Sequence, residues 1–203
     1  AVMIEPSPWG GDHTGIELDQ PEFLRFLAQA ARDAGALLVF DEVFSGYRVP
    51  QGTVQRSSGV VPDLACAGKA LASGMPLSAA VGRADIMRAC MPRIFYPGPT
   101  FRGEVYSLAA AKATLELYRQ LDVPGHVHDY GTRLREGVAR LSAQLGIAAS
   151  CVGPPYRMLL LLQEPDPDRF RLMRTLFVQE ILKGGVTSFL GILIPSYAHD
   201  EAA

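Results

Sequence analysis

Apolar residues along the chain fall into two patterns, helical spacing and short continuous runs. Within residues 21–34 the apolar positions repeat with the period of an α-helix, at Phe23, Leu24, Leu27, Ala30 and Ala31. The segment 36–40 is a continuous apolar run of strand length, which is typical of a strand buried on both faces of a parallel sheet. A helix leading into such a strand predicts an α/β fold.

The same patterns recur to the end of the chain. Strands are predicted at 2–4, 64–67, 76–82 and 158–162, and helices at 85–90, 104–121, 129–145 and 168–183. Pro124-Gly125 is expected to break the chain between two of these helices. The elements after this break have an α+β character. We therefore predict two domains, residues 1–123 and 124–203, with the second one smaller.

Ionisable residues follow two of the predicted strands directly. Asp41-Glu42 comes after the strand at 36–40, and Gly68-Lys69 comes after the strand at 64–67. Ligands of open α/β sheets bind outside the carboxyl ends of the strands, so these groups are expected to face one crevice. The apolar and glycine neighbours of Lys69 predict partial desolvation of its amine, which lowers an amine's pKa and favours the nucleophilic neutral form.

Each of these residues also has a simpler structural interpretation. Lys69 could be a surface lysine whose aliphatic stem covers apolar residues. Asp41 could cap the turn that follows its strand, with Glu42 as a solvated neighbour. A carboxylate such as Asp41 could equally pair with the protonated pyridine nitrogen of pyridoxal 5′-phosphate (PLP). The pattern of residues leaves these alternatives open.

Composition narrows the class of protein further. The chain is 48% hydrophobic with a formal net charge of −2, and it has no basic cluster, so we expect no nucleic-acid partner. Its apolar runs are too short to span a bilayer, and we expect no membrane segment. Three widely spaced cysteines suggest reduced thiols in a cytoplasmic protein. The four histidines lack ligand spacing, and no metal site is expected.

An ordered series of motifs then resembles a known family. The longest of them is Phe40-Asp41-Glu42-Val43-Phe44-Ser45-Gly46-Tyr47-Arg48-Val49. It is followed by Pro62-Asp63-Leu64, Gly68-Lys69, Gly82-Arg83-Ala84-Asp85 and Thr100-Phe101-Arg102-Gly103-Glu104. In this order and spacing they resemble class III PLP-dependent aminotransferases, nearest to the glutamate-1-semialdehyde 2,1-aminomutase branch. The resemblance implies the type I, aspartate-aminotransferase-like fold, with part of the large PLP-binding domain in 1–123 and a truncated small domain in 124–203.

The resemblance also implies roles for single residues. Lys69 would be the catalytic lysine that forms the internal aldimine with PLP and also moves protons. Asp41 would pair with the pyridine nitrogen, and Val43 would pack on the ring face. Thr100 would donate a hydrogen bond to the cofactor phosphate of a neighbouring subunit, which implies a homodimer. A plain loop threonine is the alternative at that position.

Two further residues are candidates for substrate binding. Arg48 could hold a substrate carboxylate with two hydrogen bonds, although a structural ion pair with Asp41 or Glu42 is an equal alternative. Trp9 could line the substrate pocket or serve as a packing residue.

The family's amino-terminal half contains a glycine-rich phosphate turn and an aromatic residue that stacks on the cofactor, and neither is found in this sequence. We therefore expect a fragment of an aminotransferase that acts on an amino donor and a carbonyl acceptor. Two alternatives remain, an aminomutase of the glutamate-1-semialdehyde type and a catalytically inactive fragment that serves as a dimerisation module. We expect the chain alone to bind PLP weakly or not at all, and its exposed strand edges to promote association.

Overall fold

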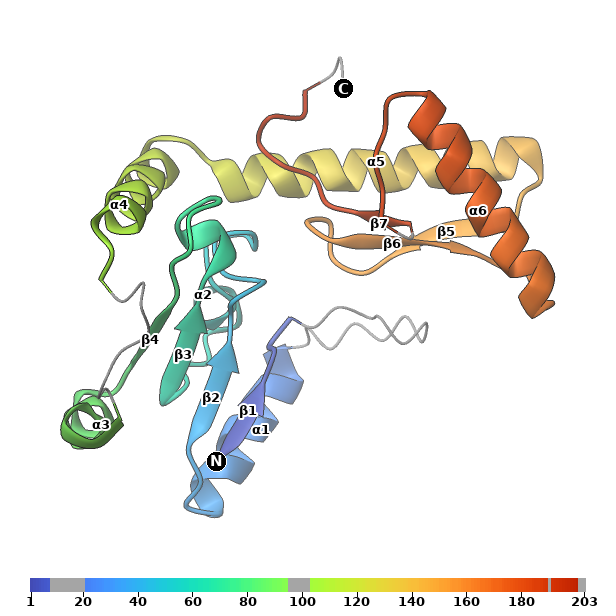
Figure 1. Cartoon of the computed structure of the whole chain (residues 1–203). Coiled ribbons are helices and arrows are strands. Elements are labelled where there is room, and N and C mark those ends of the chain that lie inside the picture. Colours follow the sequence, from blue (N-terminus) through green and yellow to red (C-terminus); the bar gives the residue numbers. More distant parts are fainter. Residues whose placement is uncertain (8–20, 95–102, 190, 201–203) are drawn as a thin grey trace. The chain divides into compact units, whose positions relative to one another are not determined.

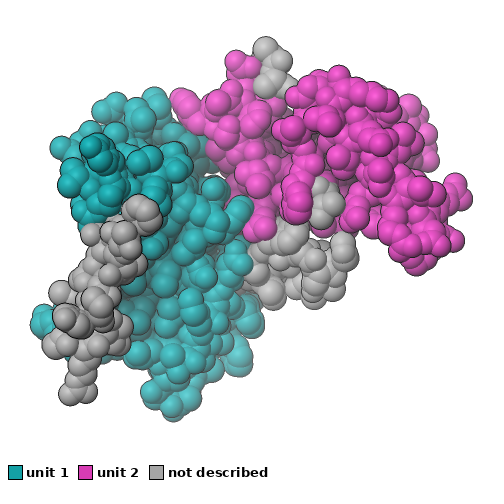
Figure 2. All heavy atoms as spheres, viewed as in Figure 1, with its two compact units in different colours: residues 1–8, 18–125 teal, residues 9–17, 126–203 magenta. Residues whose placement is uncertain are grey.

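The computed structural model describes residues 1–7, 21–94, 103–189 and 191–200. The described residues divide into two compact units (Figure 2), one up to Gly125 and the other from His126 onward. The mixture of helices with a mainly parallel sheet confirms the predicted α/β class. No helix among the described residues has both the length and the apolar character needed to cross a membrane.

The first unit is built on a four-stranded sheet with strand order β1-β2-β3-β4 (Figure 1). Its strands are β1 (Val2–Ile4), β2 (Leu38–Asp41), β3 (Leu64–Ala67) and β4 (Ala79–Gly82). β2 is parallel to both β1 and β3, whereas β4 pairs antiparallel with β3. All four strands were predicted, but the apolar pattern contained no information on the direction of β4.

Burial along β2 differs from the prediction of a strand covered on both faces. Leu38 and Phe40 are buried, whereas Val39 and Asp41 are half-buried. Alternate residues of a strand point to opposite faces, so one face of this sheet is covered more completely than the other within the chain.

The helices of the first unit are α1 (Pro21–Asp33), α2 (Val54–Ser58), α3 (Ala84–Ile94) and α4 (Val105–Gln120), together with the 3₁₀ turn η1 (Lys69–Leu71). In α1 the buried residues are Leu24, Ala28 and Ala31, so the predicted Phe23 and Ala30 lie outside the buried stripe. α4 begins one residue after its predicted start, because Glu104 caps it: the Glu104 carboxylate accepts hydrogen bonds from the amides of Tyr106 and Ser107.

The second unit contains a three-stranded antiparallel sheet and two long helices. Its elements are α5 (Val123–Leu145, which begins in the first unit), β5 (Ala149–Val152), β6 (Met158–Leu162), α6 (Pro167–Lys183) and β7 (Ile192–Leu193). The α+β character predicted for this part is present. The boundary near residue 123 stays a prediction about domains.

The predicted break at Pro124-Gly125 is wrong, because both residues lie in the first turn of α5. The Asp122 carboxylate accepts a hydrogen bond from the Gly125 amide at 3.1 Å, which caps the new helix. Proline is compatible with a first helical turn because its missing N–H would have no partner there. The helix therefore starts six residues before the predicted position 129.

Candidate active site

The predicted cofactor residues lie at one edge of the sheet, where β2 and β3 end. Asp41 is the last residue of β2 and is paired in register with Cys66 of β3. Lys69 follows β3 after a single glycine and opens the turn η1. Because β2 and β3 are parallel, the structure brings Asp41 and Lys69 to the same end of neighbouring strands.

Lys69 is exposed, so the expectation of a partly desolvated amine is wrong for this chain. Its backbone has φ of +43°, in the left-handed region that residues with a side chain seldom adopt. The next residues, Ala70 and Leu71, are buried, and Leu71 packs in a cluster with Ala111 of α4. The turn therefore anchors itself through its apolar residues and directs the lysine outward.

The approach to Lys69 depends on the small size of Gly68. A Cβ atom at Gly68 would lie 3.3 Å from Cγ1 of Val43, closer than ordinary contact. Val43 therefore packs against the backbone that leads into the lysine. The Val43 amide donates a hydrogen bond to Oδ1 of Asp41 at 3.0 Å, so Asp41 does cap the turn after its strand.

Glu42 is buried, with only 2% of its surface exposed, and the expectation of a solvated neighbour is wrong. Its Oε2 accepts a hydrogen bond from the Val54 amide at 2.6 Å, and its Oε1 accepts one from Nε2 of Gln55 at 3.3 Å. Burial raises the pKa of this carboxyl group, against the opposing effect of the hydrogen bonds. Glu42 thus joins the two ends of the loop 43–53.

Two cationic groups lie over one aromatic ring inside this loop. The Arg48 guanidinium carbon is 4.4 Å from the Phe44 ring centroid, and Nζ of Lys69 is 5.5 Å from the same centroid. Nη1 of Arg48 also donates a hydrogen bond to the Phe44 carbonyl oxygen at 2.6 Å. Phe44 belongs to the longest motif, but no role was predicted for it from the sequence. The signal that could have identified it is an aromatic residue three positions after Asp41.

The loop is also attached to α4 by stacked aromatic rings. The rings of Tyr47 and Tyr118 lie 5.5 Å apart with an angle of 3° between their planes. Burial raises the pKa of the Tyr47 hydroxyl, and the Glu42 carboxylate raises it further. The Tyr118 hydroxyl donates to the Ala70 carbonyl oxygen at 3.5 Å, which links α4 to the turn that carries Lys69.

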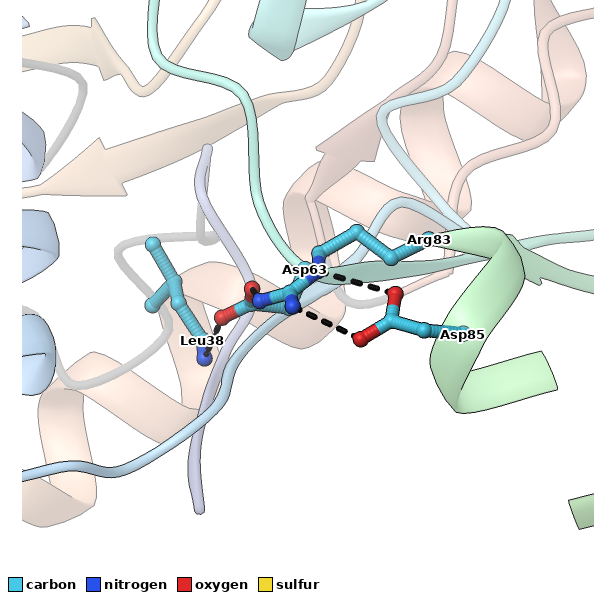
Figure 3. A network of polar contacts seen from close by, with 4 residues as sticks. All are labelled: Leu38, Asp63, Arg83 and Asp85. Carbon is cyan, nitrogen blue, oxygen red and sulfur yellow. Dashed lines mark hydrogen bonds and ion pairs between the residues drawn. The ribbon is translucent and has the colours of Figure 1, made fainter. Parts of the chain in front are cut away.

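Other motif residues stabilise the opposite end of the sheet (Figure 3). Oδ2 of Asp63 accepts a hydrogen bond from the Leu38 amide at 2.8 Å, and Oδ1 pairs with Nη1 of Arg83 at 2.7 Å. Arg83 also pairs with Asp85 at 2.8 Å. These contacts join the start of β2, the start of β3 and the segment after β4. The Pro62-Asp63-Leu64 and Gly82-Arg83-Ala84-Asp85 motifs are therefore structural, and they lie away from the candidate site.

Trp9 and Thr100, the other two predicted site residues, lie outside the described residues. The described part of the chain contains no group of three or more His, Cys, Asp or Glu side chains arranged to hold a metal ion. The site described here therefore consists of Asp41, Val43, Phe44, Arg48 and Lys69.

Comparison with known proteins places this arrangement in a family. The class-III aminotransferase family matches residues 1–149. A glutamate-1-semialdehyde 2,1-aminomutase from Thermomicrobium roseum is 36% identical over 150 residues, which is 73% of this chain and 34% of the relative. A second aminomutase of that name, from Rhodopirellula baltica, is 35% identical over 82% of this chain and 37% of its own length. The chain thus spans about a third of these relatives.

Solved structures agree with the sequence comparison. The PLP internal aldimine form of the FumI protein from Sphingopyxis sp. MTA144 superposes with a TM-score of 0.81 at 30% identity, covering 90% of this chain and 43% of that one. A β-phenylalanine aminotransferase from Variovorax paradoxus gives a TM-score of 0.79 at 28% identity, covering 98% and 48%. These likenesses confirm the predicted type I fold. The chain belongs to the class-III aminotransferase family.

Proposed function

We propose that this chain supplies the lysine side of the active site of a PLP-dependent aminotransferase, which moves an amino group between an amine or amino acid and a carbonyl acceptor. The observation that carries the proposal is the placement of Asp41 and Lys69 at the carboxyl ends of two neighbouring parallel strands. A carboxylate and a primary amine at one sheet edge suit the two ends of the PLP ring, its pyridine nitrogen and its aldehyde.

The described residues fit this cofactor. Lys69 is exposed and can reach an aldehyde. The absence of a side chain at Gly68 lets Val43 pack closely against the backbone beside the lysine. Asp41 would hold the proton of the pyridine nitrogen, and Val43 would pack on the ring face. When bound, PLP supplies an aldehyde for amine condensation and a ring that withdraws electrons.

The remaining roles belong to the chain's own groups. Nζ of Lys69 would take a proton from the substrate carbon and return it as general base and acid. Arg48, already held by Phe44, would bind a substrate carboxylate, with Trp9 lining the pocket. Thr100 would donate to the cofactor phosphate across a homodimer. All three cysteines are free thiols, which supports a cytoplasmic location.

An aminomutase that shifts an amino group within one substrate is the second candidate. It is favoured by the names of the sequence relatives, which are glutamate-1-semialdehyde 2,1-aminomutases at 35 to 36% identity. The inactive dimerisation module is the third. Chemical modification of Lys69 separates the third candidate from the first two.

The test is covalent capture of PLP. The chain is incubated with PLP, reduced with borohydride, and mapped by mass spectrometry beside Lys69→Ala and a Lys112→Ala control. Lys112 is an exposed lysine of α4 that pairs with Glu116 at 3.9 Å. Because reduction makes even a short-lived imine permanent, weak binding is enough for labelling, and we expect the label on Lys69 in the parent and in the control, and its loss in Lys69→Ala. Equal labelling of all three lysines, Lys69, Lys112 and Lys183, would contradict the proposal.

A further inference from the structure

The Phe44 ring is the contact that the described structure offers to the charged end of Lys69. Nζ of Lys69 lies 5.5 Å from the ring centroid, within the range in which a cation is attracted to the electron-rich face of an aromatic ring. Lys69 is otherwise an exposed lysine at the start of a turn. A long side chain in that setting normally samples many rotamers, so a specific partner for its amine is informative.

Both partners of this contact are held by their backbones. Lys69 is fixed at a φ of +43°, where the η1 turn places the Leu71 amide on the Gly68 carbonyl at 2.9 Å. Phe44 lies in the loop whose ends Glu42 joins, and Arg48 binds its carbonyl and covers its ring. The meeting of amine and ring therefore follows from two rigid backbone segments at the ends of β2 and β3.

We propose that Phe44 is a positioning residue for Lys69. Its ring holds the side-chain amino group of Lys69, when no cofactor is attached to it, at the carboxyl edge of β2 and β3, beside Asp41 and Val43. The ring attracts the ammonium form without forming a bond, so the lysine can leave and return. The role in catalysis rests on the proposed function, whereas the contact itself does not. A cation–π contact at an exposed site favours the docked position by about two- to five-fold.

The Phe44 ring also carries a second cation, the guanidinium of Arg48. Its guanidinium lies over the same ring at 4.4 Å, so the two cations are no farther apart than the sum of their distances to the centroid. Two like charges near one another repel, and the shared aromatic ring offsets that repulsion. Phe44 thus lets a lysine and an arginine occupy one small region of the site.

The experiment uses the unmodified chain without PLP, so it is independent of the cofactor test. The sequence contains three lysines, Lys69, Lys112 and Lys183, so a sample with ¹³C-labelled lysine gives three side-chain signal sets. A ring current from Phe44 is expected to shift the ε-methylene protons of Lys69 upfield, and to give cross-relaxation with the ring protons. Lys112 and Lys183, which pair with glutamates on helix surfaces, serve as internal references.

Two variants decide the outcome. Phe44→Leu keeps an apolar side chain and should return the Lys69 signals to the positions of Lys112 and Lys183, with a loss of about two- to five-fold in docked population. Phe44→Tyr keeps the aromatic ring and should preserve the upfield shift. Unchanged Lys112 and Lys183 signals would show that each variant is folded. Lys69 signals at the same position in the parent and in Phe44→Leu, or an absence of cross-relaxation in the parent, would overturn the proposal.

Discussion

Asp41 and Glu42 are adjacent carboxylates with opposite environments. Asp41 ends β2 half-buried at the open edge, with one oxygen on the Val43 amide. Glu42 is turned into the protein, where it accepts from the Val54 amide. Alternation along an extended chain sends neighbouring side chains to opposite faces. A single Asp-Glu pair therefore provides one carboxylate for the site and one for the loop that covers it.

This division predicts distinct effects for changes at Glu42. Glu42→Ala would leave the buried Val54 amide without its acceptor, which should lower the free energy of unfolding by about 1–3 kcal/mol. Because the pKa of Glu42 is raised in the folded state, its contribution to stability is fully present below the unfolded pKa and is lost as pH rises through the folded pKa.

Urea unfolding at several pH values checks both points, with Glu42→Gln as the neutral control. The advantage of the parent over Glu42→Gln should grow as the pH falls from 7 toward the unfolded value near 4.5. A difference between the two proteins that stays constant with pH would show that folding leaves the pKa of Glu42 unchanged, and would contradict the prediction.

At the scale of elements, the sequence predicted where strands lie along the chain more accurately than it predicted the contacts between elements. The strands at 64–67 and 158–162 were predicted with their observed bounds, because short apolar runs between turn residues define them. The start of α5 was missed because Pro124-Gly125 breaks helices in general, and the capping contact of Asp122 reverses that preference. β5 was missed because Ala149–Val152 has no alternating pattern.

The candidate site shows the same limit. The placement of Asp41 and Lys69 at one edge followed from the sequence, because parallel strands bring their carboxyl ends together. The burial of Glu42, the exposure of Lys69 and the role of Phe44 did not. Each of these three features depends on the direction of a side chain in or beside a loop. The conformation of this loop is set by contacts between residues more than ten positions apart, such as Glu42 with Val54, and local sequence patterns do not reveal such contacts.

The Asp63 network gives a prediction at this scale. Asp63 accepts a hydrogen bond from the Leu38 amide and also forms an ion pair with Arg83 (Figure 3). Asp85 forms an ion pair with the exposed Arg83. Asp63→Ala should therefore destabilise the first unit by about 1 kcal/mol or more, and Asp85→Ala should have little effect. Thermal unfolding of both variants compares them directly, and equal losses would contradict the assignment of Asp63 as the joining residue.

The pH dependence of that network has the opposite sign to that of Glu42. The Leu38 amide lowers the pKa of Asp63 most, and Arg83 lowers it further. A carboxyl group with a lowered folded pKa contributes stability above its unfolded value, here 3.8, and loses it as the pH falls through the folded pKa. The stability difference between the parent and Asp63→Ala should accordingly shrink below about pH 3.8.

For the whole molecule, the outer strands of the first unit are the prominent feature. β1 and β4 are the outermost strands of the sheet. Within the described residues, 1–7, 21–94, 103–189 and 191–200, no further strand pairs with either of them. Both carry exposed apolar side chains, Met3 at 61% and Val81 at 52%. Unpaired strand edges with apolar side chains are templates for association with another chain.

This predicts that the chain self-associates through its strand edges. The average mass measured by light scattering should rise with protein concentration, and Val81→Lys combined with Met3→Lys should reduce that rise, because charged side chains on an edge strand oppose further pairing. Val61→Lys is the matched control, since Val61 is 76% exposed but lies outside any strand. If the control reduces association as much as the edge variants do, general surface hydrophobicity drives it. An edge-specific effect would instead show that the unpaired edges of β1 and β4 drive the association.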